Sequence, residues 1–313
     1  MRYVDVDGMR VSCIGLGAWQ FGSREWGYGE AYATETAPAL VHRALDLGIT
    51  MIDTAEAYGP ARSERIIRDA LATVPDSEQD GLVVATKFLP IAPAEPIVAW
   101  QARGSMRRLG VDALDLYYAH WPNPFVSPRR TMQSVRPLVA EGVVRRVGVS
   151  NHSLAAWQEA ERALRAPVIA NQVRFSLASP EPASDLVPYA ATNDRLVVAY
   201  SPLAQGLLAR DGAPPPGASP RGFRSRDPRF RAAGDGRLAP LTDAIHAVAA
   251  AHGATPAQVA LAWLLSHANT VAIPGARTVA QLEENAAAAD LDLAPDEIAR
   301  LTALAEERAT SRR

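Results

Sequence analysis

Eight short apolar runs alternate with eight segments of helical periodicity along most of this chain, which limits the folds open to it. We predict strands at residues 14–18, 50–52, 82–86, 114–119, 146–149, 168–171, 196–199 and 271–273. We predict helices at residues 36–47, 63–73, 96–109, 128–141, 154–164, 185–191, 241–252 with 256–266, and 279–289. Strands that alternate strictly with helices are parallel and joined by right-handed crossovers, so eight such units can close a barrel.

Both ends of the chain add an element to this alternation. Residues 3–6 and 9–13 are β-rich and are joined by an Asp-Gly pair, a strong hairpin signal. Pro295 and the two acids after it favour the first turn of a helix that runs to about Arg308. With 313 residues, 48% of them hydrophobic, the chain can bury a large core. We therefore expect residues 1–313 to form one domain, a single (β/α)8 TIM barrel with an N-terminal β-hairpin cap and an extra C-terminal helix.

Charge and composition exclude several classes of partner. A net charge of −2 gives no reason to expect a nucleic acid or an anionic membrane as partner. The irregular segment 203–238 is rich in arginine, but Asp227 and Asp235 interrupt the cations, so it is predicted to cover a cofactor rather than to bind RNA. No clean apolar window of about 20 residues predicts a membrane span.

The cysteines and histidines bear on the cellular compartment and on metal binding. The single cysteine, Cys13, and a start without an apolar signal core favour a reducing cytoplasm. The six histidines lack the cysteine or carboxylate spacing of a ligand set, so no metal is expected. The oligomeric state is left open.

Polar or aromatic residues follow nearly every predicted strand. They are Trp19, Asp53, Lys87, His120, Ser150 with Asn151, Gln172 and Tyr200. The exception is the eighth strand, which is followed by Gly275. In a (β/α)8 barrel these positions meet on the face formed by the carboxyl ends of the strands, where active sites lie. Each residue alone has a simpler explanation, such as a helix cap for Asp53 or a satisfied core histidine for His120. Their shared location predicts a functional site on this face.

Four of these side chains suggest proton transfer to a carbonyl oxygen. Tyr58 lies five residues after Asp53, and a phenol with a pKa near ~10 needs help to donate at neutral pH. Lys87 is the one lysine among 32 basic residues, the others being arginine. This indicates a position that needs an amine; chance or a salt bridge is the simpler alternative. We expect Tyr58 to donate the proton, Lys87 to stabilise the phenolate, Asp53 to hold Lys87, and His120 to orient the substrate.

These motifs resemble those of the aldo-keto reductase family, and the resemblance runs nearly end to end. The segments Ile-Asp-Thr-Ala-Glu-Ala-Tyr-Gly, Val-Ala-Thr-Lys-Phe and Tyr-Tyr-Ala-His-Trp-Pro place Asp53, Tyr58, Lys87 and His120 at the four positions of the family's catalytic tetrad. The resemblance implies the (β/α)8 barrel. It also implies reduction of aldehydes or ketones to alcohols by hydride transfer from NADPH, which becomes NADP+.

The resemblance further implies how the chain holds its cofactor. Ser150, Asn151 and Gln172 match the residues that hold the nicotinamide carboxamide, and Tyr200 matches the one that stacks on the ring. The family's positions along the pyrophosphate correspond to Ser201, Leu203, Gln205 and Gly206. Its positions at the adenosine end correspond to Gly275, Arg277, Gln281, Glu284 and Asn285. Many relatives have arginine where this chain has Gln281, so one cation, Arg277, is expected to meet the 2′-phosphate. The expected preference for NADPH over NADH is therefore modest.

Aromatic residues gather in the loops predicted on the same face. The proposed substrate pocket contains Trp19, Trp26, Tyr28, Trp121 and Phe125. The tryptophans in helical segments, Trp100, Trp157 and Trp263, are predicted to be packing residues. An apolar, aromatic-lined pocket favours aryl or alkyl aldehydes over highly charged substrates. Packing of the loop tryptophans on the scaffold is the equal alternative.

The sequence thus predicts an NADP(H)-dependent enzyme that acts on a small-molecule carbonyl substrate. An alternative from another class is a regulatory subunit that senses nicotinamide redox state and turns over slowly, as some relatives with the same tetrad do. A third is a barrel isomerase or lyase without a redox cofactor.

Overall fold

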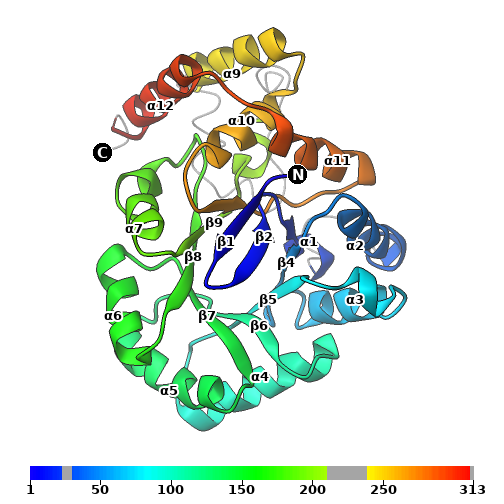
Figure 1. Ribbon diagram of the computed structural model, residues 1–313, viewed down its shortest axis with the longest axis vertical. Helices are drawn as coiled ribbons and strands as arrows, with labels where there is room; N and C mark the ends of the chain where they lie inside the picture. The colour runs from blue at the N-terminus through cyan, green and yellow to red at the C-terminus, as the bar shows by residue number, and fades with distance from the viewer. Residues whose placement is uncertain (23–29, 210–237, 311–313) are drawn as a thin grey trace.

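The computed structural model describes residues 1–22, 30–209 and 238–310, which form the predicted barrel (Figure 1). Its parallel strands are β3 (Leu16–Gly17), β4 (Met51–Asp53), β5 (Val83–Phe88), β6 (Leu114–Ala119), β7 (Val144–Ser150), β8 (Val168–Arg174), β9 (Leu196–Tyr200) and β10 (Thr270–Ala272), paired in chain order. Hydrogen bonds from Gly15 N to Ala272 O (2.8 Å) and from Ala272 N to Cys13 O (2.9 Å) join the two ends of the sheet. The (β/α)8 prediction is confirmed.

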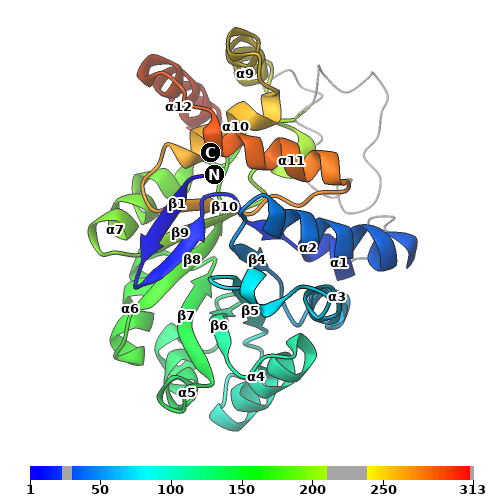
Figure 2. The ribbon, with the colours of Figure 1, turned by 45° about the vertical axis from the view of Figure 1, so that its right-hand side comes forward.

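Helices follow the strands and surround the sheet (Figures 1 and 2). The longer ones are α2 (Ala37–Asp46), α3 (Arg62–Leu71), α4 (Glu95–Leu109), α5 (Pro128–Ala140), α6 (Leu154–Leu164), α7 (Leu186–Thr192), α9 (Ala239–His252), α10 (Pro256–Leu265), α11 (Val279–Ala287) and α12 (Pro295–Thr310). Short helical turns are α1 (Trp19–Gly22), η2 (Tyr32–Thr36), η3 (Asp76–Glu78), η4 (Glu181–Ser184), η5 (Ala204–Gly206) and η8 (Ala288–Asp290). Every predicted helix is present, including the final one, whereas the short turns were not predicted.

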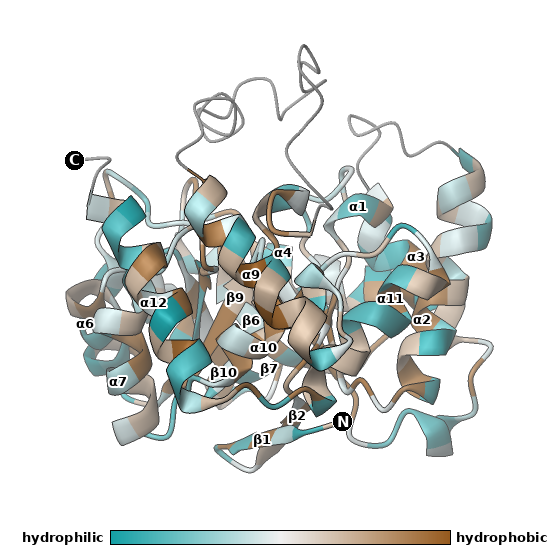
Figure 3. Cartoon of the chain, turned by 90° about the horizontal axis from the view of Figure 1, so that it is seen from above, coloured by the Kyte–Doolittle hydropathy of each residue, from teal (hydrophilic) through white to brown (hydrophobic). Residues whose placement is uncertain are grey.

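The N-terminal hairpin closes one end of the barrel. It consists of antiparallel β1 (Tyr3–Val6) and β2 (Met9–Ser12). Val6, Met9 and Val11 belong to one buried cluster with strand residues such as Leu116 and Val198. Figure 3 shows the hairpin below the strands, at the end of the barrel opposite α1. The cap therefore supplies apolar side chains to the barrel interior, and this prediction is confirmed.

The packing predicted for the helical tryptophans holds for two of three. Trp157 and Trp263 are fully buried, but Trp100 is 70% exposed, so the packing role predicted for it is wrong. The buried face of α4 contains Val98 and Ala102. Trp100 lies midway between these two positions, and with 3.6 residues per turn it must therefore point away from the sheet.

Outside the barrel, a buried polar cluster anchors β5. The Thr86 hydroxyl donates to Glu64 Oε1 at 2.7 Å, and Arg108 Nε donates to Glu64 Oε2 at 2.5 Å. Glu64 is fully buried, and these hydrogen bonds offset the cost of burying its polar atoms. Because side chains alternate along a strand, fixing Thr86 outward points Lys87 into the barrel.

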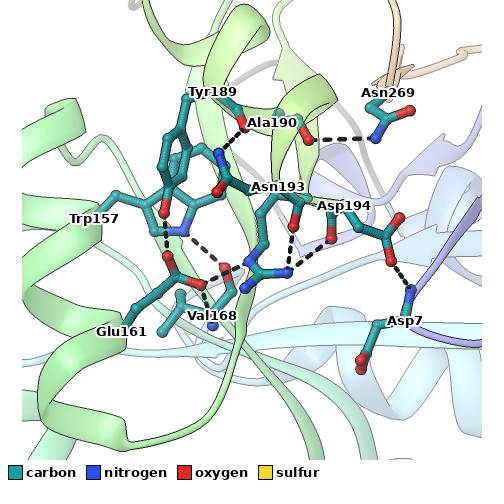
Figure 4. Close-up of polar contacts among 10 residues, drawn as sticks. Asp7, Trp157, Glu161, Val168, Tyr189, Ala190, Asn193, Asp194 and Asn269 are labelled. Carbon is teal, nitrogen blue, oxygen red and sulfur yellow. Dashed lines mark hydrogen bonds and ion pairs between the residues drawn. The ribbon is translucent and has the colours of Figure 1, made fainter.

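A second carboxylate ties together the starts of β8 and β9 (Figure 4). Glu161 Oε1 accepts hydrogen bonds from Val168 N at 3.2 Å and Arg195 Nε at 2.6 Å, and Oε2 accepts one from the Tyr189 hydroxyl. Trp157 Nε1 donates to Val168 O at 2.7 Å. The far ends of these two strands bear predicted site residues, so this contact fixes strands that shape the site.

We expect Glu161→Ala to lower the free energy of unfolding by about 3 kcal/mol, because it leaves a largely buried guanidinium without its carboxylate and a backbone N–H without its acceptor. Urea denaturation followed by circular dichroism measures the change. Glu159→Ala is the matched control on the same helix, where the described residues supply no hydrogen bond or ion pair, and it should shift stability by less than about 0.5 kcal/mol. Equal stability of the two variants would contradict the role given to Glu161.

No single helix in residues 1–22, 30–209 and 238–310 is long and apolar enough to cross a membrane. The pair α9 and α10 reaches that length and composition only when taken together, and the two are bent by 95° at the break between them.

Candidate active site

A buried ion pair lies at the centre of the site. Lys87 Nζ donates to Asp53 Oδ1 at 2.5 Å and to the carbonyl oxygen of Thr54 at 2.7 Å. Lys87 is 0% exposed and Asp53 2%. The two residues come from the neighbouring strands β5 and β4. Charges so deeply buried are tolerated when their remaining hydrogen-bonding positions are filled.

Gln172 hydrogen-bonds to the other oxygen of the Asp53 carboxylate. Its Nε2 donates to Asp53 Oδ2 at 2.6 Å from β8, across the barrel. Burial raises the pKa of Asp53, while the charge and hydrogen bond of Lys87, and then Gln172, oppose that rise. Burial lowers the pKa of Lys87, and Asp53 opposes that change. Each member of the pair thus stabilises the ionised form of the other.

Tyr58 lies in the loop after β4, with its ring above the ammonium. Lys87 Nζ is 5.0 Å from the ring centre. Burial, and then the nearby Asp53 charge, raise the pKa of Tyr58 well above its usual value. The phenol is therefore protonated at neutral pH and available as a donor. In the described residues the Lys87 ammonium donates to Asp53 and to the Thr54 carbonyl, and not to the phenol oxygen.

Two glycines position the loop that holds Tyr58. Gly59 has φ 60°, in the left-handed region, and a Cβ there would lie 2.1 Å from Gly22 O. A Cβ on Gly22 would lie 2.3 Å from Tyr58 O. Only glycine permits this close backbone contact, which sets Tyr58 against the end of α1.

His120 follows β6 and faces the phenol. Its ring centre is 5.7 Å from that of Tyr58 at an interplanar angle of 76°, and it stacks on Trp121 at 5.0 Å and 11°. Burial, followed by the Lys87 charge, lowers the pKa of His120 to about 3. The imidazole is therefore neutral at physiological pH. It can donate one hydrogen bond without adding a positive charge beside Lys87.

These groups border one cavity of about 480 Å³ at the carboxyl ends of the strands. Predicted residues that line it are Asp53, Tyr58, His120, Ser150, Asn151, Gln172, Tyr200, Ser201, Leu203, Gln205, Gly275, Trp19 and Trp121. Lys87 lies beneath its floor rather than in its wall. The structure thus brings the four predicted catalytic side chains and most of the predicted cofactor residues to one place.

Other predicted site residues lie away from the cavity wall. Those in the described residues are Gly206, Arg277, Gln281, Glu284, Asn285 and Phe125. The Phe125 side chain is 95% exposed, so the structure does not bring it to the predicted pocket. Arg277 and Gln281 are exposed at the start of α11, where Arg277 N donates to Gln281 Oε1 at 2.9 Å. Trp26, Tyr28 and most of the segment 203–238 lie outside the described residues.

A hydrogen-bonded chain fixes the aromatic side of the cavity. The Tyr200 hydroxyl donates to Asn151 Oδ1 at 2.9 Å, Asn151 Nδ2 donates to Ser150 Oγ at 3.0 Å, and Ser150 Oγ donates to Gln172 O at 2.9 Å. Asn151 has φ 58° and Gln205 φ 59°, in the left-handed region that costs energy outside glycine. Strain of this kind gathers at functional sites, and here both residues border the cavity.

Several residues of the site were not predicted from the sequence. The Thr54 carbonyl gave no signal, because any residue type can supply a backbone oxygen. Gln20 lines the cavity from the short turn α1, and Leu89 and Pro274 line it from loops; the sequence defined the course of none of these segments. Arg174 also lines it and was missed because the strand was predicted to end at residue 171, whereas β8 continues to Arg174.

Among the described residues, no cluster of three or more His, Cys, Asp or Glu side chains could hold a metal ion.

Comparison with known proteins places this site in a family. Residues 13–306 match the Aldo/keto reductase family. The chain is 49% identical over 294 residues to the uncharacterized oxidoreductase Rv2298 of Mycobacterium tuberculosis H37Rv, a match that covers 94% of this chain and 89% of that protein. It is 31% identical over 293 residues to methylglyoxal reductase YeaE of Escherichia coli K12, with 93% and 90% covered.

A solved structure supports the same family. The crystal structure of an aldo/keto reductase from Klebsiella pneumoniae in complex with NADP and acetate matches with a TM-score of 0.76 and 31% identity, over 96% of this chain and 94% of that one. The family match over nearly the whole chain, together with the (β/α)8 barrel, shows that this protein belongs to the aldo/keto reductase family of oxidoreductases.

Proposed function

We propose that this protein reduces aryl or alkyl aldehydes, and related ketones, to alcohols with NADPH, with Tyr58 as the proton donor. The observation that supports this most directly is the enclosed ammonium of Lys87, held by Asp53 beneath the Tyr58 ring at the floor of a cavity with aromatic walls. The E. coli relative is a methylglyoxal reductase, which is consistent with a small carbonyl substrate.

The cavity wall fits the nicotinamide end of such a cofactor. Tyr200 offers an aromatic face, and Ser150 and Asn151 offer the hydroxyl and amide groups expected to hold a carboxamide. Gln205 Oε1 is buried and has no hydrogen-bond partner among the described residues, so it has an unused acceptor. We propose that these residues hold the nicotinamide and that Arg277 meets the 2′-phosphate. The K. pneumoniae neighbour was crystallised with NADP, which supports the choice of cofactor.

The protein's own groups then handle the proton. When bound, NADPH supplies the hydride. Tyr58 hydrogen-bonds to the substrate carbonyl oxygen and gives it a proton as negative charge develops there. Lys87 stabilises the resulting phenolate by its charge, which Asp53 and the Thr54 carbonyl keep in place. His120, neutral, donates a second hydrogen bond that orients the carbonyl.

Titration with NADPH and NADH, followed by turnover with aromatic, aliphatic and sugar aldehydes, tests this function. Loss of nicotinamide absorbance with aryl or alkyl aldehydes is the expected result. Tight NADPH binding with only slow turnover would favour the regulatory alternative. Absence of nicotinamide binding would contradict both and favour a barrel isomerase or lyase.

The cofactor assignment makes its own prediction. We expect Arg277→Ala to weaken NADPH binding about 10-fold and to leave NADH binding unchanged, because a guanidinium hydrogen bond to phosphate is lost only with NADPH. Fluorescence titration with both cofactors measures the ratio. Arg300→Ala, which removes an exposed arginine of α12, is the control and should change neither affinity. An unchanged NADPH to NADH ratio in Arg277→Ala would remove Arg277 from the phosphate site.

We also propose that residues 1–313 form one domain and that the enzyme works in a reducing cytoplasm. The cysteine count supports the second point, because the single Cys13 cannot form a disulfide within the chain.

A further inference from the structure

Arg174 is a cavity residue to which no role has yet been given. It is the last residue of β8, its register partner on β9 is Tyr200, and both side chains line the cavity. The guanidinium carbon lies 5.8 Å from the centre of the Tyr200 ring. Arg174 is exposed, so its charge faces the open part of the cavity rather than the protein interior.

Among the described residues, the groups around Arg174 do not balance its charge. The other charged residue in the described cavity wall is Asp53, which is already paired with Lys87. His120 is neutral at physiological pH, since its pKa lies at about 3. No carboxylate in the described part of the chain forms an ion pair with Arg174, whereas Arg108 and Arg195 each hold a glutamate. The described part of the cavity therefore presents one unpaired cation to a ligand.

The strand order indicates which ligand this cation faces. β9 lies between β8 and β10. The segments assigned to the cofactor's pyrophosphate and adenosine follow β9 and β10, so they leave the barrel rim on one side of Tyr200. Arg174, on β8, lies on the other side. That side bears the residues assigned to the nicotinamide, Ser150, Asn151 and Gln172, and none of those assigned to the cofactor's phosphates. Beyond them, after β6, His120 and Trp121 enter the cavity wall.

We infer that Arg174 is a specificity-determining residue that favours carbonyl substrates with a carboxylate or similar anionic group at the end remote from the reacting carbonyl. A planar guanidinium binds a carboxylate through two parallel hydrogen bonds, and the Tyr200 ring beside it limits its orientation. The neutral aromatic walls formed by Trp19 and Trp121 accept the body of the substrate. This inference rests on the proposed reductase function and adds the substrate class to it.

A matched pair of substrates tests the inference. 4-Carboxybenzaldehyde and 4-methylbenzaldehyde have similar shapes and differ in charge. With the wild-type protein and NADPH, we expect a higher kcat/KM for the carboxylated aldehyde. Arg174→Gln should lower kcat/KM for that substrate about 10-fold to 100-fold, chiefly through KM, and leave the neutral substrate nearly unchanged. Arg65→Gln, an exposed arginine of α3, is the control and should alter neither rate.

An unchanged preference between the two aldehydes in Arg174→Gln would overturn the inference. If NADPH affinity were weaker in that variant at the same time, Arg174 would instead belong to a cofactor phosphate. Calorimetric titration with benzoate keeps the inference separate from the reductase proposal. Weaker benzoate binding to Arg174→Gln than to wild type supports anion recognition even if no aldehyde is turned over, and equal binding contradicts it.

Discussion

Tyr58→Phe is expected to lower the turnover number for aldehyde reduction by at least about 100-fold while leaving NADPH affinity nearly unchanged. The phenol oxygen is the only atom removed, and the ring would still pack beside His120 and above the Lys87 ammonium. The raised pKa of Tyr58 means that the wild-type phenol holds its proton until charge develops on the substrate oxygen. Loss of that proton donor should therefore affect the chemical step and not the binding of the cofactor.

Steady-state rates at saturating NADPH and a separate fluorescence titration distinguish the two effects. Tyr3→Phe is a suitable control, because it also removes one hydroxyl, here bonded to Gly48 O at 3.1 Å in the N-terminal hairpin, far from the cavity. It should retain full activity. Near-normal reduction by Tyr58→Phe would remove this residue from the mechanism.

Lys87→Arg is expected to reduce turnover almost as much as Tyr58→Phe, although it keeps the positive charge. The ammonium is completely enclosed and bonds at 2.5 Å and 2.7 Å to Asp53 and Thr54 O. A guanidinium is broader and forked, so it would displace one of these acceptors or press against the Tyr58 ring. Its charge is also spread over three nitrogens, so it should stabilise a phenolate less well.

Insertion of the larger group into a packed site is expected to cost about 1 to 3 kcal/mol of stability, so thermal unfolding should be followed together with the rates. Lys87→Met separates charge from volume, because it removes the cation without adding bulk. It should be at least as inactive as Lys87→Arg, with NADPH affinity little changed in both. Arg65→Lys exchanges the same two residue types on the exposed face of α3 and should change neither turnover nor NADPH affinity. If Lys87→Arg kept most of its activity, the lone lysine would be an accident of composition.

The barrel and the centre of the site could be predicted because they depend on local patterns. Apolar runs of strand length end in a polar residue, and eight of them alternate with helices, so the closed sheet and its carboxyl-end face follow from topology. Asp53, Lys87 and His120 are found together for that reason, without any knowledge of loops.

Contacts across the barrel could not be predicted in the same way. Gln172 was assigned to the cofactor. In the structure it also donates a hydrogen bond to the second carboxylate oxygen of Asp53, 119 positions away in the chain. The Thr54 carbonyl that receives the second Lys87 hydrogen bond has no residue signature at all. Arg174 was missed because a polar Asn171 was taken as the strand end, although Asn171 is buried and its Nδ2 donates to His152 O at 2.8 Å. Burial of a polar side chain in β8 thus concealed where the strand ends.

The enclosure of Lys87 gives this enzyme a natural spectroscopic probe. Because the sequence contains one lysine, protein labelled with carbon-13 at the lysine ε-carbon would show a single lysine side-chain signal, without any need for assignment. That signal comes from the side chain that contacts Asp53 and lies beneath the phenol of Tyr58. Its chemical shift would report the protonation state of the buried amine directly, and its change on adding NADPH or an aldehyde would show how the charge under the phenol responds when the cavity fills.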